Sequence, residues 1–136
     1  MAISSVLTNT FKEELLGGYH SFNAAGDTPA GSAFKLALYS SGDANLGTTT
    51  TQWVVASTPS ADPTNTYEVT TTSSGYTSGG NALTNTGVAK STVTSYTDFS
   101  DTSWTSASFT ARGCLIYNSS SISGLTTNAA VCSIDF

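Results

Sequence analysis

Two cysteines are the residues whose types and spacing could do chemistry together. Cys114 and Cys132 each lie in an apolar run, and if these runs pair as a hairpin with the cysteines opposite each other, the thiols could form a disulfide. Their apolar neighbours favour the alternative, two buried free thiols that act as small hydrophobic side chains. Two sulfurs and one distant histidine do not complete a zinc site, so the sequence predicts no metal.

The single histidine, His20, is the only candidate of the usual type for a general base. Serine is abundant, but the chain has no Gly-x-Ser-x-Gly motif, and nothing ties one serine to His20. We therefore expect His20 at the surface or at a helix end. Asp98 and Asp101 are better explained by a turn than by a calcium site. Without a phosphate loop or a dinucleotide fingerprint, the sequence predicts no catalytic residue and no cofactor.

The two tryptophans allow two interpretations. As exposed aromatic side chains, Trp53 and Trp104 could form platforms on which sugar rings stack. As ordinary packing residues, each would fill the edge of a thin core, and this second interpretation is favoured.

An amphipathic helix is expected near the start of the chain. Three apolar residues recur at a spacing of four, which gives one apolar stripe: Leu7, Phe11 and Leu15. We expect a helix over residues 4–16, with Ser4 or Ser5 as its N-cap and Gly17–Gly18 as its stop. Residues 1–18 could pack this helix on their own sheet, or form a docking arm whose stripe contacts a neighbouring subunit.

From residue 19 onward, alternation of apolar and polar residues predicts strands separated by turns. The expected strands cover residues 34–39, 48–55, 66–70, 88–96, 104–109, 111–118 and 129–136. The last two would form a core hairpin around a loop at 119–128. We expect residues 19–136 to be one mainly β domain, an antiparallel two-sheet β-sandwich of jelly-roll or Ig-like type, preceded by one short helix.

Composition restricts the classes of partner. Serine and threonine supply 46 of 136 residues, whereas only 13 residues are charged and the net charge is -5. Nucleic-acid binding needs clustered Lys and Arg, which are missing, so no nucleic acid is expected. No stretch approaches the roughly 18 apolar residues that span a bilayer, so no membrane is expected. The first residues lack the basic flank and the apolar run of a signal peptide.

Several motifs follow one another in an order that resembles small structural virion proteins of tailed bacteriophages. They are the helix end at 11–18, the Phe-Lys-x-Ala-Leu-Tyr strand at 34–39, the Leu-Gly and Thr-rich turn at 46–51, the Gly-Tyr-x-x-Gly-Gly segment at 75–83, the Asp-x-x-Trp to Thr-Ala-Arg-Gly-x-x-Ile-Tyr-Asn stretch at 101–118, and the final Asp-Phe. The chain departs from this pattern in its cysteine pair and in a Thr/Ser-rich insert around residues 56–74.

The resemblance implies a non-enzymatic part of a phage particle, of decoration, neck or tail type. We expect a capsid decoration or cement subunit, with a neck, collar or tail component as the alternative. Its partners would be other virion proteins and further copies of itself, since a small domain gains buried area by oligomerising. It would be made in the host cytoplasm and reside in the virion. A carbohydrate-binding host-adsorption module is the hypothesis from another class.

Overall fold

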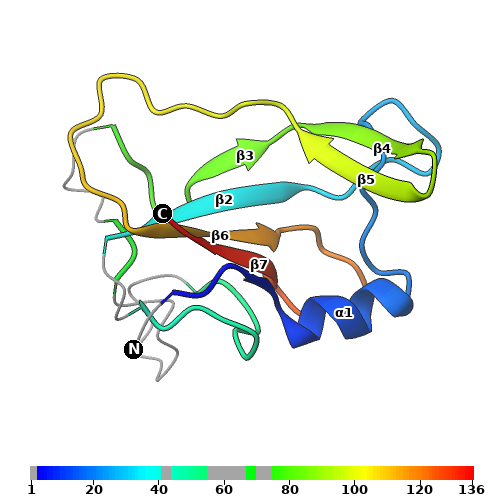
Figure 1. Cartoon of the computed structure of the whole chain (residues 1–136), viewed down its shortest axis with the longest axis horizontal. Helices are drawn as coiled ribbons and strands as arrows, with labels where there is room; N and C mark the ends of the chain where they lie inside the picture. The colour runs from blue at the N-terminus through cyan, green and yellow to red at the C-terminus, as the bar shows by residue number, and fades with distance from the viewer. Residues whose placement is uncertain (1–2, 41–43, 55–66, 70–74) are drawn as a thin grey trace.

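The computed structural model describes residues 3–40, 44–54, 67–69 and 75–136. Its elements, in chain order, are β1 (Val6–Leu7), α1 (Asn9–Leu16), β2 (Phe34–Tyr39), β3 (Asn81–Leu83), β4 (Asn85–Ser91), β5 (Thr94–Phe99), β6 (Gly113–Asn118) and β7 (Ala129–Asp135) (Figure 1). The strands form a five-stranded sheet in the order β1-β7-β6-β2-β3 and a two-stranded sheet, β4-β5. All strand pairs are antiparallel, which confirms a mainly β fold with one short helix.

Strand β2 shows why the sheet has a core on both faces. Phe34 and Leu36 alternate with Ala37 and Tyr39, as predicted, and the two sets belong to separate apolar clusters. All six residues of the neighbouring strand β6 are buried. Central strands that are covered on both sides are expected to be apolar at successive positions, and residues 36–39 of β2 and 114–117 of β6 meet that condition.

Strands β6 and β7 pair as predicted, but the predicted register is wrong by two residues. Cys114 lies opposite Ile134, and Ile116 lies opposite Cys132, with a register irregularity after Ile116. The shift is two residues up to Ile116 and one residue after the irregularity. Side chains alternate with a period of two, so the two-residue shift around Cys114 leaves those side chains on the same face. The apolar pattern therefore could not distinguish the two registers, and the cysteines end up diagonal rather than opposite.

The N-terminal segment differs from the predicted continuous helix over residues 4–16. Val6 and Leu7 are extended and pair with β7 as its edge strand, so the helix begins only at Asn9. Thr8 replaces the expected serine cap: its Oγ1 accepts a hydrogen bond from Phe11 N (3.1 Å) and donates one to Ala130 O (2.6 Å). From Val6 to Leu7 the segment thus forms part of its own sheet.

Three other predicted strands also need correction. Residues 88–96 are not one strand but parts of the β4–β5 hairpin. Thr92 adopts a φ of 53° in its turn, where a hairpin usually shows Asn-Gly, so the usual turn signature was missing. Residues 104–109 belong to none of the strands. The described part of 48–55 forms no strand either and contributes only the isolated β-bridge between Gln52 and Ala129. Val55, Thr66 and Thr70 lie outside the described residues, as does most of the 56–74 insert.

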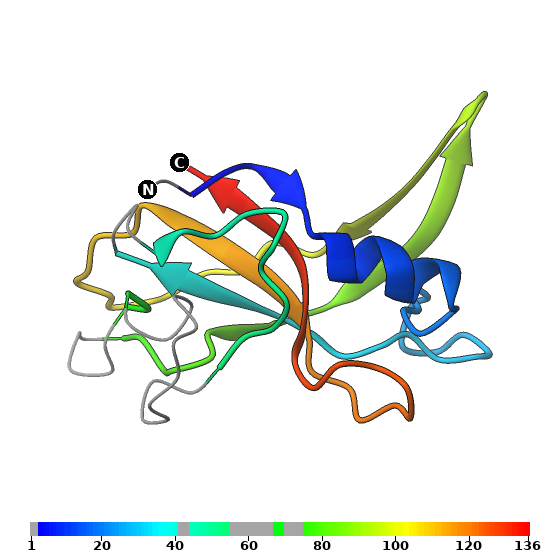
Figure 2. The ribbon, with the colours of Figure 1, turned by 90° about the horizontal axis from the view of Figure 1, so that it is seen from below.

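The β4–β5 hairpin stands apart from the rest of the molecule. Figure 2 shows it extending away from the body, with α1 beside its base. Five of the six residues of β5 are exposed, and Val93 in the turn is 94% exposed. The hairpin contacts the main sheet at its base, where the Phe99 ring lies 5.4 Å from the Phe34 ring.

Candidate functional site

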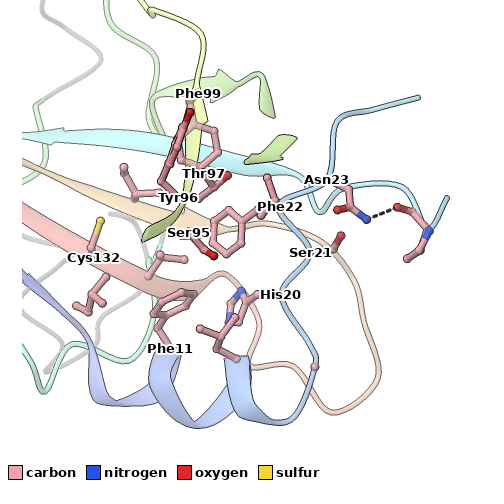
Figure 3. Close-up of a pocket in the computed structure, with 17 residues that line it drawn as sticks. Phe11, His20, Ser21, Phe22, Asn23, Ser95, Tyr96, Thr97, Phe99 and Cys132 are labelled. Carbon is pink, nitrogen blue, oxygen red and sulfur yellow. Dashed lines mark hydrogen bonds between the residues drawn. The ribbon is translucent and has the colours of Figure 1, made fainter. Parts of the chain in front are cut away.

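A groove of about 800 Å³ lies between α1, the segment that follows the helix, and the β4–β5 hairpin (Figure 3). Ile116 of β6 and Val131 and Cys132 of β7 also line it. Among the described residues, the lining carries no Lys, Arg, Asp or Glu side chain, and its one imidazole ring is that of His20. The groove is therefore suited to an uncharged, largely apolar ligand or protein surface.

The predicted docking residues meet in this groove, although they come from two elements and not from one helix. Leu7 belongs to β1, and Phe11 and Leu15 belong to α1, yet all three line the same space. Phe11 is buried, whereas Leu7 and Leu15 are 47% and 44% exposed. The stripe thus splits into a packed residue and two residues that remain half open to solvent.

An aromatic cluster forms part of the groove wall at the base of the hairpin. Phe22 stacks on Phe34 with 4.6 Å between ring centroids, and Phe11 meets Phe22 edge-on at 6.0 Å. Phe99 joins the cluster from β5. Sequence reasoning missed Phe22 and Phe99 as site residues, because each is an isolated aromatic residue in a polar stretch and no local period marks it.

His20 is buried in the wall of the groove, so of the two expected positions the surface is wrong; the ring lies just beyond the end of α1. Its Nε2 lies 3.1 Å from Glu14 Oε2, and its Nδ1 lies 3.0 Å from Asn118 Nδ2. An amide nitrogen only donates, so Nδ1 accepts, and the ring proton sits on Nε2 and is donated to Glu14. Burial lowers the pKa of His20, while the hydrogen bond and the charge of Glu14 oppose that change. Both ring nitrogens are therefore occupied by structural partners.

Both cysteines are free thiols, which agrees with the interpretation that their neighbours favoured. Cys114 is buried in the core, and Cys132 is partly buried and points into the groove (Figure 3). Burial raises the pKa of Cys114 to about 12 and that of Cys132 to about 11. Each thiol is therefore protonated near neutral pH, when it is a weak nucleophile.

The tryptophans do not form exposed platforms. Trp53 is 9% exposed and stacks on Tyr117 with 5.3 Å between ring centroids. Trp104 is half-buried and stacks on Tyr76 at 6.2 Å. Their placement matches the favoured interpretation, in which each ring packs at the edge of the core.

Glu68 is a buried carboxylate that the sequence did not single out. Its two oxygens accept hydrogen bonds from four donors: Trp53 Nε1 (3.3 Å), Tyr76 Oη (2.8 Å), Ser78 Oγ (3.1 Å) and Gly79 N. Burial, and secondly the charge of Glu68, raise the pKa values of Tyr76 and Tyr117 well above the usual range. The carboxylate anchors the Gly-rich turn at 75–80 to the core.

The described residues contain no group of three or more His, Cys, Asp or Glu side chains that could hold a metal ion. Within the same ranges, no helix has the length and apolar character needed to cross a membrane. No known protein family, curated protein or solved structure matches the chain.

Proposed function

We propose that this chain is a non-enzymatic structural protein of a tailed bacteriophage particle, with capsid decoration or cement as its role. The observation that carries the proposal is the exposed β4–β5 hairpin beside an uncharged apolar groove. An isolated two-stranded hairpin is marginally stable in water, so a neighbouring surface would favour its order. The mechanism is adhesion through apolar and hydrogen-bonded contacts, without a chemical step.

Exposed apolar side chains at the groove and on the hairpin support the same role. Val88 is 60% exposed and lines the groove together with the half-exposed Leu7 and Leu15. Single exposed apolar residues are ordinary, but a cluster beside a groove is typical of an interaction site. Neighbouring coat subunits are the partners that the resemblance to virion proteins implies.

A neck, collar or tail component is the alternative within this proposal, because the same adhesive surface would serve there. The carbohydrate-binding hypothesis relied on Trp53 and Trp104 as an exposed strip. Trp53 is buried and Trp104 packs on Tyr76, so these side chains give that hypothesis no support.

The finer class of fold is part of the proposal as well. We propose a two-sheet β-sandwich of jelly-roll or Ig-like type, in which the five-stranded sheet and the β4–β5 sheet meet at the base of the hairpin. The contact between Phe99 and Phe34 supports it, since it joins the two sheets through one aromatic pair. An experimental structure of the assembled particle would decide between jelly-roll and Ig-like connectivity.

Quantitative mass spectrometry of purified particles tests the role. A copy number comparable with that of the coat protein is expected for a decoration subunit, and a copy number far below it would favour the neck or tail. Absence from particles whose genome encodes the chain would overturn the proposal.

A further inference from the structure

We propose that the Asn118 side chain is a proton-driven switch: when His20 takes up a proton, the Asn118 amide rotates and releases the backbone N–H of Ser120. The switch consists of these three residues, and it joins the segment that follows α1 to the start of the loop at 119–128. It would operate whatever role the chain has in a particle.

Two contacts fix the orientation of the Asn118 amide while His20 is neutral. Asn118 Oδ1 accepts a hydrogen bond from Ser120 N (2.9 Å), and Asn118 Nδ2 lies 3.0 Å from His20 Nδ1. A backbone N–H only donates, so the amide oxygen must face Ser120 and the amide NH2 group must face the ring. His20 Nδ1 is therefore an acceptor. Asn118 is 0% exposed, so bulk water does not replace a partner that is lost.

A proton on His20 Nδ1 places two donors opposite each other. Both nitrogens of a protonated imidazole donate, so the new N–H would face the NH2 group of Asn118. A half-turn of the amide points Oδ1 at the ring and restores a hydrogen bond there. The same half-turn points the NH2 group at Ser120 N, which then has no acceptor on Asn118. In either orientation one of the two contacts is lost.

The contact with Ser120 is the one that gives way. A hydrogen bond from a charged ring is about twice as strong as one from a neutral backbone N–H, so the amide oxygen turns to His20. The ring itself is held in place, since it packs on Phe11 at 4.9 Å and on Phe34 at 6.4 Å between ring centroids. Its Nε2 donates to Glu14 in both states. Ser120 is only partly buried and begins a loop, so its N–H can move toward water.

The surroundings of His20 leave it as the group that senses pH. Burial lowers the pKa of His20 from 6.5, while the hydrogen bond and the charge of Glu14 oppose that change. Glu14 is the charged group that contacts the ring from α1. The other rings against it, Phe11 from α1 and Phe34 from β2, carry no charge, and the loop at 119–128 has no titratable side chain. The switch therefore operates below pH 6.5.

Nuclear magnetic resonance can follow the switch directly, because the chain has a single histidine. At pH 7.5 we expect the ring proton on Nε2. As the ring titrates on acidification, the hydrogen-exchange protection of the Ser120 amide should fall at least about tenfold, because its acceptor is withdrawn. Two amides are internal controls that should keep their protection: Thr126 N donates to Glu14 Oε1, and Val69 N donates to Leu38 O.

Two variants separate the switch from other effects of acid. His20→Gln keeps one donor and one acceptor on the side chain but takes up no proton, so Ser120 protection should be independent of pH. Asn118→Asp supplies carboxylate oxygens that accept from Ser120 N and from a protonated ring at once. In this variant we expect the ring to be protonated already at pH 7.5 and Ser120 to stay protected at low pH. Circular dichroism melting curves establish that each variant is folded.

Several results would overturn the switch. In wild-type protein they are a ring proton on Nδ1 at pH 7.5, a ring that stays neutral down to the acid limit of the folded state, and Ser120 protection that stays constant while the ring titrates. Equal losses at Ser120, Thr126 and Val69 would show general unfolding in place of a local release. A loss in His20→Gln or in Asn118→Asp as large as in the wild type would assign the effect to another group.

Discussion

Strand β6 and the β4–β5 hairpin are both antiparallel β-structure with regular backbone pairing, but they bury their side chains to opposite extents. All six residues of β6 are buried, whereas five of the six residues of β5 are exposed. Backbone hydrogen bonds alone contribute modestly to stability, and apolar burial is the dominant favourable term. The comparison indicates that the sheet is stabilised by apolar packing, whereas the exposed part of the hairpin relies mainly on its backbone pairing.

The largest expected difference is between the losses of unfolding free energy that one substitution causes in each region. Leu115 in β6 is 0% exposed, and Leu115→Ala should lower the free energy of unfolding by about 2–5 kcal/mol, because it removes apolar contacts and leaves a cavity. Val93→Ala at the hairpin turn should change the free energy of unfolding of the monomer by less than about 0.5 kcal/mol. Denaturant titration measures both changes, provided that the slope of unfolding free energy against denaturant concentration is the same in each variant as in the wild type. Equal losses would show that the hairpin shares the core's stability.

The buried carboxylate tests the polar part of the core. In Glu68→Gln, one carboxylate oxygen becomes an amide group that only donates, opposite donors such as Tyr76 Oη and Gly79 N. We expect a loss of about 1–3 kcal/mol in the free energy of unfolding, since at least one buried donor is left without an acceptor. Asp101→Asn, at an exposed position, is the control and should have little effect. If Glu68→Gln left the free energy of unfolding unchanged, the Gly-rich turn would be held by contacts other than those of Glu68.

A smaller effect is expected from the pH dependence of stability. Because the pKa of His20 in the folded chain is lowered from 6.5, the unfolded chain takes up this proton first as the pH falls. Stability from this group is fully present above about pH 6.5 and decreases below it, toward the folded-state pKa.

Melting temperatures between pH 7.5 and pH 5.5 measure this decrease. In His20→Gln the decrease should be smaller, because the group that titrates in this window is gone. A steeper decrease in the variant than in the wild type would contradict the assignment to His20.

The sequence predicted the parts of the fold that a local pattern specifies. Three features could be predicted because each depends on residues that are neighbours in the chain. They are the alternation in residues 34–39, the hairpin of the last two strands and the helix stop at Gly17. The partner of Cys114 in β7 could not be predicted, since a shift of the pairing by two residues leaves each side chain on the same face of the sheet. The buried positions of His20 and Glu68 depend on partners more than five residues away, such as Asn118 and Tyr76.

The candidate site was predicted only in part, for the same reason. The spacing of Leu7, Phe11 and Leu15 predicted one helical stripe, whereas the structure places Leu7 in β1; all three nevertheless line the groove. The other wall of the groove comes from a hairpin that lacks the usual Asn-Gly turn signature, so the sequence pattern gave one long strand instead.

The smallest expected effects concern the two thiols, one of which lies in the core and the other in the groove lining. Both cysteines are free and diagonal in the sheet, so a reductant should leave the melting temperature unchanged, and unfolded protein should take up two alkyl groups per chain. In folded protein, Cys132 should react before the more buried Cys114, and its rate should rise about tenfold per pH unit toward its pKa of about 11. Cys114 in the core is the internal control, and equal reaction rates for the two thiols in folded protein would contradict the difference in burial between them.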